Sequence, residues 1–325
     1  MNATANSESS AARPGAVPLV AAFAAIYLIW GSTYIAIRFA IQTIPPLLMM
    51  GARNFLAGVA LFAWMRLRGA PSPARKHWMG ALVTGILLFL IDHGALAWAE
   101  QRIPSSLAAL LCATTPFSMV IFARLAGQER KISPATWLGL VVGLAGVSLL
   151  VGPDALFHNG STDVLGCVVV LIAASAWAAG SIVGRMVPLP DSPALSAGMQ
   201  MMVGGASLLC AGTLIGEGAR FHPAAVTFSS LAWFGYLVTF GSIVAFTAYI
   251  WLLRVIPPSR VATHAYVNPV VAILLGWALA DEPIGIRVWV AAATILAGVA
   301  LVNSTKWRAA PDTAPTLSKP GLDSV

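Results

Sequence analysis

WGSTYIAIR at residues 30–38 and WAAGSIVGR at residues 177–185 each begin with Trp and end with Arg. The two segments are 147 residues apart (177 − 30 and 185 − 38). The same offset relates four further pairs of identical residues: Pro46/Pro193, Gly51/Gly198, Gly58/Gly205 and Leu61/Leu208. An offset of 153 residues (251 − 98) relates another set: Trp98/Trp251, Ile103/Ile256, Pro104/Pro257, Pro116/Pro269 and Glu129/Glu282. The chain therefore consists of two related halves.

The composition indicates an all-α membrane protein. Hydrophobic residues make up 58% of the 325 positions and charged residues 10%, with a mean hydropathy of +0.82, whereas soluble domains carry about 25% charged residues. The apolar stretches are each about 20 residues long, enough to cross the hydrocarbon core as a helix, and they show no strand-like alternation. We predict ten spans: 17–38, 46–66, 78–100, 104–124, 134–152, 164–187, 193–215, 228–253, 259–280 and 286–304.

The number of spans in each half predicts the topology. The first repeat covers 17–152 and the second 164–304, with a linker at 153–163 and disordered tails at 1–16 and 305–325. Five spans is an odd number, so the second half must enter the membrane from the opposite side. The two five-helix repeats are therefore expected to be inverted, an arrangement typical of secondary transporters. The first span is too long for a cleaved signal peptide, and we expect it to be retained.

The positions of the basic residues predict the orientation. If the N-terminus is cytoplasmic, fourteen Lys and Arg residues fall on the inner side: Arg13, Arg66, Arg68, Arg75, Lys76, Arg124, Arg130, Lys131, Arg185, Arg254, Arg260, Lys306, Arg308 and Lys319. Four fall outside: Arg38, Arg102, Arg220 and Arg287. The positive-inside rule then places both termini in the cytoplasm and the linker in the periplasm. The net charge of +7 is a topology signal, and we expect no nucleic-acid partner.

Several short motifs occur at matched places in the two halves. They are Trp30-Gly31-Ser32-Thr33-Tyr34, the pairs Thr115-Pro116 and Asn268-Pro269, and the loops at Glu129 and Glu282. Together with the duplication, they resemble the EamA family of the drug/metabolite transporter superfamily, over about residues 17–304. The resemblance implies ten helices around a central cavity and movement of small metabolites, often outward, across a bacterial inner membrane. It specifies no substrate.

Ionisable residues inside the predicted spans are the first candidates for function. Asp92 and His93 lie in the apolar third span. A central Asp costs about 2.5–3.5 kcal/mol on insertion scales, and each apolar neighbour returns about 0.3–0.6 kcal/mol, so the helix inserts but the carboxylate needs a partner or water. The matching stretch of the second half is Val244-Ala245-Phe246-Thr247, so this charge is not duplicated. Asp92 either handles substrate or protons or forms a structural ion pair.

Arg53 is the expected partner of Asp92. Each lies about eight residues from the outer end of its span, which places both about 12 Å below the outer surface. The alternative is that Arg53 snorkels to the interface. His93 precedes Glu100 by seven residues on one helical face, which suits a proton relay or helix packing. Whether transport is coupled to protons stays open.

Other candidates come from the aromatic and helix-breaking residues. Trp30, Tyr34 and Trp177 are predicted to line a cavity, where their rings would bind apolar or cationic groups. His264 replaces Leu111 of the first half, and Tyr266 and Asn268 follow it in the ninth span; cavity lining and packing are both open. Helix breaks are expected at Pro116 and Pro269, at equivalent places in the two halves. A stripe of small residues at Gly139, Gly143 and Gly146 favours packing between helices of the same chain over dimerisation.

The sequence offers little support for catalysis. It contains no HExxH, GxSxG or Walker-type motif, and the three cysteines form neither a metal set nor a disulfide framework. We therefore predict a non-enzymatic exporter of amino acids, related compounds or drugs in the bacterial inner membrane, with no cofactor or metal, working by alternating access as a monomer or homodimer. The alternatives are a non-transporting sensor or assembly subunit, and a nucleotide-sugar carrier, which should place several basic residues in its cavity.

Overall fold

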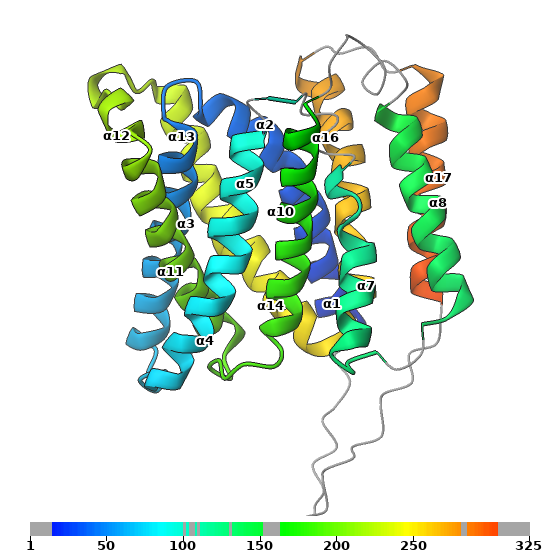
Figure 1. Ribbon diagram of the computed structural model, residues 1–325, viewed down its shortest axis with the longest axis horizontal. Coiled ribbons are helices and arrows are strands. Elements are labelled where there is room, and N and C mark those ends of the chain that lie inside the picture. The colour runs from blue at the N-terminus through cyan, green and yellow to red at the C-terminus, as the bar shows by residue number, and fades with distance from the viewer. Residues whose placement is uncertain are drawn as a thin grey trace, which may run out of the picture.

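The computed structural model describes residues 15–99, 102–103, 108, 111–129, 132–151, 163–280 and 285–304. Within them, every regular element is a helix, as predicted. Seven helices are long and apolar enough to cross a membrane, and helix occupies part or all of each of the ten predicted spans. Figure 1 shows these helices packed side by side with their axes roughly aligned. The linker at 153–162 and both predicted tails lie outside the described residues, except at their edges.

In the first half, three of the spans are continuous helices of 22 to 25 residues. The elements are α1 (Ala16–Ala24), η1 (Ala25–Ile29), α2 (Trp30–Ala40), α3 (Pro46–Leu67), α4 (Arg75–Gly85), η2 (Ile86–Ile91), α5 (Asp92–Ala99), α7 (Thr115–Leu125) and α8 (Pro134–Val151). Here η1 and η2 are π-helical turns that join the α-helical segments on either side of them.

The second half repeats this arrangement. Its elements are α10 (Val164–Val183), α11 (Pro193–Leu214), α12 (Glu217–Arg220), the 3-10 turn η3 (Pro223–Ala225), α13 (Phe228–Tyr236), the π-helical η4 (Leu237–Val244), α14 (Ala245–Val255), α15 (Pro258–Val261), α16 (His264–Ala280) and α17 (Ile286–Ser304). Shifting η2 by 153 residues places it at 239–244, inside η4. The third and eighth spans therefore widen at equivalent points. Such π-helical turns are rare and often mark functional sites.

The repeated glycines hold α3 against α11. A Cβ added to Gly51 would lie 3.1 Å from the carbonyl of Gly205, and one added to Gly58 would lie 2.7 Å from that of Gly198. These are the residues related by the 147-residue offset, so each repeated position contacts the partner of the other. Small residues allow membrane helices to approach this closely, and the contact follows the pseudo-two-fold symmetry of the sequence.

A second glycine contact joins α8 to α17, on the opposite side of the bundle from α3 and α11 (Figure 1). A Cβ on Gly139 would lie 2.7 Å from the carbonyl of Gly298, and one on Gly146 would lie 2.8 Å from the backbone of Ile295. The stripe at Gly139, Gly143 and Gly146 therefore packs internally, as predicted. The polar residues described below lie on α3 of the first pair and on the neighbouring segments α5 and η4.

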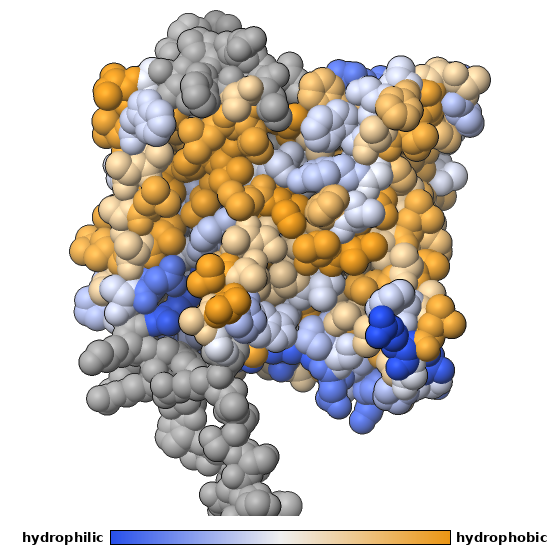
Figure 2. Space-filling model, turned by 180° about the vertical axis from the view of Figure 1, so that it is seen from behind, coloured by the Kyte–Doolittle hydropathy of each residue, from blue (hydrophilic) through white to orange (hydrophobic). Residues whose placement is uncertain are grey.

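The sides of the bundle match an apolar environment. Leu28, Leu56, Val141, Ile172 and Leu296 are among many large apolar residues that are exposed there. Figure 2 shows orange and pale residues over most of the height and the strongest hydrophilic colours toward the ends. Exposed apolar surface of this extent would be unstable in water but is stable against lipid.

The N-terminus of α10 is capped by a titratable side chain, that of Asp163. The carboxylate of Asp163 accepts a hydrogen bond from the backbone N–H of Gly166 at 3.0 Å and lies 3.3 Å from the guanidinium of Arg102. The backbone bond, with Arg102 contributing less, lowers the pKa of Asp163 below its ordinary 3.8. Ser192 caps α11 in the same way, since its hydroxyl accepts from the N–H of Leu195 at 3.3 Å.

Candidate functional site

Arg53 lies within α3 and points toward η4 of the other half. Its side chain is buried, with the residue 5% exposed. Nε donates to the hydroxyl of Ser242 at 3.2 Å, and one terminal nitrogen is 3.8 Å from the sulfur of Met50. Among the described residues Arg53 forms no ion pair. The predicted ion pair with Asp92 is therefore wrong, and so is its alternative, snorkelling to the interface. Equal depth fixes the height of two residues in the membrane, but it does not fix the direction in which each side chain points from its helix.

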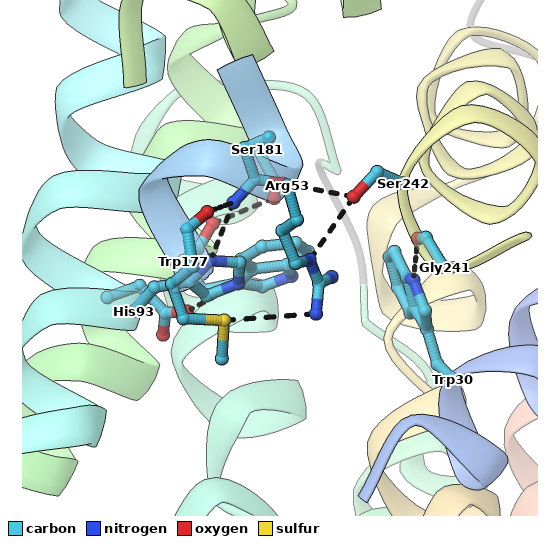
Figure 3. Close-up of polar contacts among 10 residues, drawn as sticks. Trp30, Arg53, His93, Trp177, Ser181, Gly241 and Ser242 are labelled. Carbon is cyan, nitrogen blue, oxygen red and sulfur yellow. Dashed lines mark hydrogen bonds and ion pairs between the residues drawn. The ribbon is translucent and has the colours of Figure 1, made fainter. Parts of the chain in front are cut away.

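His93 connects Asp92 to the same polar group. Its Nε2 is 3.8 Å from a carboxylate oxygen of Asp92, and its Nδ1 is 3.4 Å from the amide nitrogen of Asn54. The hydroxyl of Ser242 in turn donates to the amide oxygen of Asn54 at 3.1 Å. Figure 3 shows this group reaching from Arg53 to His93. Polar side chains from α3, α5 and η4 thus form one connected network, which we call the polar network (Arg53, Asn54, Asp92, His93 and Ser242).

A small cavity lies against this network, with a volume of about 30 Å³. Its walls come from both halves, and they are formed by Trp30, Arg53, Asn54, Phe89, His93, Trp177, Gly241, Ser242 and Phe246. A cavity needs at least about 10–15 Å³ to hold one water, so this one holds a very few. Ligand pockets usually measure about 300–1,000 Å³, so a metabolite can enter this cavity only if the helices move apart.

Aromatic rings form much of the rest of the cavity wall and contact the polar network. Trp177 is 5.6 Å from Trp30 and 5.3 Å from Tyr249 between ring centroids, and it stacks on His93 at 6.1 Å with 19° between the ring planes. The indole N–H of Trp30 donates to the carbonyl of Gly241 at 3.0 Å, as Figure 3 shows. The two symmetry-related tryptophans therefore meet at one side of the cavity, and one of them is tied to the π-helical η4.

Comparison with known protein families also divides the chain into two halves. The EamA-like transporter family model matches residues 18–152 and again 164–304. The chain belongs to the EamA-like transporter family. It is 37% identical to the uncharacterized inner membrane transporter YedA of Escherichia coli K12 over 305 residues, which cover 93% of this chain and 96% of YedA. This EamA chain is thus a multi-pass transporter of the inner membrane.

Two further matches extend the comparison. The uncharacterized transporter YoaV of Bacillus subtilis is 28% identical over 279 residues, covering 84% of this chain and 92% of YoaV. One solved crystal structure aligns with a TM-score of 0.74 at 22% identity, covering 90% of this chain and 98% of the other. That structure shares the EamA chain's fold. The relatives are named as transporters, in line with the prediction of a non-enzymatic role.

Four of the nine predicted binding or coupling residues line the cavity: Trp30, Arg53, His93 and Trp177. Asp92 stands behind His93. His264 contacts the aromatic wall, since its ring is 5.0 Å from that of Trp30 and 5.5 Å from that of Tyr249, but it is not a lining residue. The placement of the Tyr34 side chain lies outside what the structure describes, as do Glu100 and Glu282.

Tyr266 and Asn268 do not belong to the cavity. The hydroxyl of Tyr266 donates to the carbonyl of Leu140 at 3.0 Å, and its ring packs on Gly143. Tyr266 therefore packs α16 against α8. Asn268 is buried, and its side-chain oxygen accepts no hydrogen bond among the described residues. Tyr266 differs from His264 because a residue two positions later faces another direction, whereas Asn268, four positions later, lies on the face of His264 but about one helical turn farther along α16.

The two prolines behave differently. Pro116 is the second residue of α7 and follows a turn at 113–114, so the fourth span is interrupted beside it, as predicted. Pro269 lies inside α16, which continues through it. The expected break at Pro269 is therefore wrong, since its missing N–H leaves a single carbonyl, that of Ala265, without its helical donor. The ninth span is interrupted instead at 262–263, before His264.

The sequence interpretation missed five lining residues: Asn54, Phe89, Gly241, Ser242 and Phe246. Asn54 is adjacent to Arg53, and its position inside an apolar span was an available signal. Ser242 and Phe246 correspond to Phe89 and His93 at the 153-residue offset. A search for positions where one half has a polar residue and the other half an apolar one would therefore have identified these lining residues. The π-helical turns that position these residues left no recognisable signal in the sequence.

Proposed function

We propose that this protein exports small metabolites (amino acids, related compounds or drugs) by alternating access around the cavity between its halves. The observation that carries the proposal is a small cavity lined by both polar-network and aromatic residues, drawn from both repeats. Binding sites near the midplane at the interface of inverted repeats are the general arrangement of such carriers. The paired tryptophans and the π-helical turns η2 and η4 would move with the halves that carry them.

The proposed orientation places both termini in the cytoplasm. The ends of α3, α7 and α14 and the start of α4 lie together at the lower end in Figure 1. These segments carry Arg66, Arg124, Arg254 and Arg75, which supports a cytoplasmic lower end under the positive-inside rule.

Cysteine labelling in intact cells tests this orientation. The variants Ala70→Cys and His222→Cys are made separately, each in a chain whose three native cysteines are replaced by Ser. Residue 70 follows the end of α3 and residue 222 follows α12, at opposite ends of the bundle. We expect an impermeant thiol reagent to label the His222→Cys variant and to spare the Ala70→Cys variant. The reverse pattern would contradict the orientation.

We propose that Asp92 and His93 couple transport to protons. A carboxylate and an imidazole 3.8 Å apart, both within a membrane span, suit proton exchange, and intramembrane carboxylates commonly mark such pathways. In liposomes with an imposed pH gradient, Asp92→Asn should abolish gradient-driven accumulation while leaving exchange of substrate for substrate. Accumulation that ignores the gradient in the unmodified protein would contradict the coupling.

Transport itself is tested with the purified protein in liposomes, screened against a metabolite panel. Trp177→Ala removes an aromatic wall that contacts His93, Trp30 and Tyr249, and we expect at least a tenfold loss of flux. Trp289→Ala is the matched control, because Trp289 is 57% exposed on the bundle surface and its loss should leave flux unchanged. Equal flux for both variants would refute the assignment of the cavity.

A further inference from the structure

The charge of Arg53 is not neutralised within the part of the chain that the structure describes. Its hydrogen-bond acceptors there are the Ser242 hydroxyl and the Met50 thioether, whereas a guanidinium has five N–H donors and a thioether is a weak acceptor. The nearest carboxylate of the polar network, Asp92, faces His93 instead. Arg53 therefore has unused donors at its two terminal nitrogens.

The direction of these donors is toward the cavity. Arg53 is one of the lining residues, and one of its terminal nitrogens would lie 3.7 Å from a Cβ added at Gly241, another residue of the lining. An unpaired charge inside a membrane span is costly, and a cavity of about 30 Å³ gives it only a very few waters. A residue kept at this cost for packing alone would be expected to have a carboxylate partner.

The other walls define what a ligand at Arg53 must look like. Phe89, Trp177 and Phe246 supply apolar ring surface, and Asn54 and Ser242 supply uncharged polar groups. Among the described lining residues none carries a carboxylate. A cationic ligand would meet the charge of Arg53 in a lining without a carboxylate, because Asp92 stands behind His93, although aromatic rings alone would accept it.

We propose that the transported substrate carries an anionic group, of the carboxylate type, that pairs with the terminal nitrogens of Arg53, and a flat apolar body that lies between the aromatic walls. This inference rests on the proposed transport function and names the substrate class of the same site. Arg recognises carboxylates through two parallel hydrogen bonds, which the terminal nitrogens of Arg53 can supply. The site then excludes organic amines and quaternary ammonium compounds.

Three probes with the same ring and chain separate the charge classes: 3-phenylpropionate, 3-phenylpropionamide and 3-phenylpropylamine. Binding is measured by the shift in melting temperature and tryptophan fluorescence, and flux in liposomes with the membrane potential set to zero by K⁺ and valinomycin. We expect the anion to bind and move at least tenfold better than the amide, and the amine to do neither.

Variants at two equivalent positions complete the test. Arg53→Gln should make the anion and the amide equal, and Arg53→Lys should retain part of the preference because it keeps the charge. Gln200→Met is the matched control: Gln200 occupies the place of Arg53 in the second half, is buried, and does not line the cavity. It should leave the preference intact.

The outcomes distinguish the two levels of the proposal. Three results would overturn the substrate class. The first is preferred binding of the amine, the second is no binding of any of the three probes, and the third is an anion preference that survives in a folded Arg53→Gln variant. If another compound from the metabolite panel is then moved, the transport function stands without it. If nothing on the panel is moved by protein that melts cooperatively, the transport function fails as well.

Discussion

The contact between α3 and α11 and the cavity beside it obey opposite rules. In the contact, Gly51 and Gly58 meet Gly205 and Gly198, so the two halves contribute the same residues. In the cavity, Arg53, Asn54 and His93 of the first half correspond to Gln200, Met201 and Phe246 of the second. The duplicated residues build the scaffold, and the residues that differ between halves supply the chemistry.

A symmetric contact should be intolerant of change on either side. A Cβ at Gly205 would lie 2.4 Å from the backbone nitrogen of Phe55, and backbone cannot move aside as a side chain can. We expect Gly205→Val to cost more than about 3 kcal/mol, the upper end of ordinary overpacking, and to abolish recovery of monodisperse protein. Gly58→Val should have the same effect, since its Cβ would lie 2.5 Å from the backbone nitrogen of Met202.

The control for this prediction is Gly235→Val. Nothing lies within 4 Å of a Cβ added at Gly235, so this variant should fold with a nearly unchanged melting temperature. Size-exclusion elution and melting temperature are the measurements. A Gly205→Val protein as stable as Gly235→Val would show that the α3–α11 contact is not the scaffold.

The asymmetric residues should instead change transport more than stability. Asn54→Met makes the first half resemble the second, where Met201 is the equivalent residue. It removes the acceptor of the Ser242 hydroxyl and the amide beside His93. We expect flux in liposomes to fall about tenfold, the effect of about 1.4 kcal/mol lost at the transport step, with a smaller change in melting temperature.

A conservative substitution at the equivalent position of the second half is the control for this prediction. Met201→Leu changes a fully buried residue of the second half outside the cavity, and it conserves volume, so flux should stay close to the unmodified value. A double variant Asn54→Met, Ser242→Ala should lose more than Asn54→Met alone, because Ser242 also accepts from Arg53. It should lose less than the sum of the two single losses, because each single variant already breaks the hydrogen bond that joins the two side chains. Fully additive losses would mean that they act separately.

Trp30 combines the two properties, since it is duplicated, as Trp177, and also lines the cavity. Trp30→Phe keeps an aromatic ring but loses the indole N–H that bonds the carbonyl of Gly241. The net contribution of one hydrogen bond is about 1 kcal/mol, so flux should fall about fivefold at most, with a small decrease in melting temperature. Trp177→Phe is the comparison, and Trp30→Ala should be much more severe than Trp30→Phe.

The sequence predicted the scaffold well and the site only in part. The apolar stretches predicted the ten helical ranges. The offsets of 147 and 153 residues identified the halves and the paired glycines, because scaffold packing is inherited by both copies of a duplication. Arg53 and His93 were found because a charge in a membrane span is conspicuous. Their partners were not, since the rotation of each helix depends on packing between spans and on the π-helical turns η2 and η4.

The smallest expected effect concerns two helix caps of the second half. Asp163 caps α10 and Ser192 caps α11, but only Asp163 titrates. Because the pKa of Asp163 is lowered in the folded protein, its stabilising effect is complete above its ordinary pKa of 3.8 and is lost as the pH falls through the lower folded value. Asp163→Asn keeps an acceptor at the cap without this titration. Melting temperatures from pH 6 down to pH 3 should therefore fall slightly more for the unmodified protein than for Asp163→Asn, and identical pH profiles would show that the cap of α10 contributes no more pH dependence than that of α11.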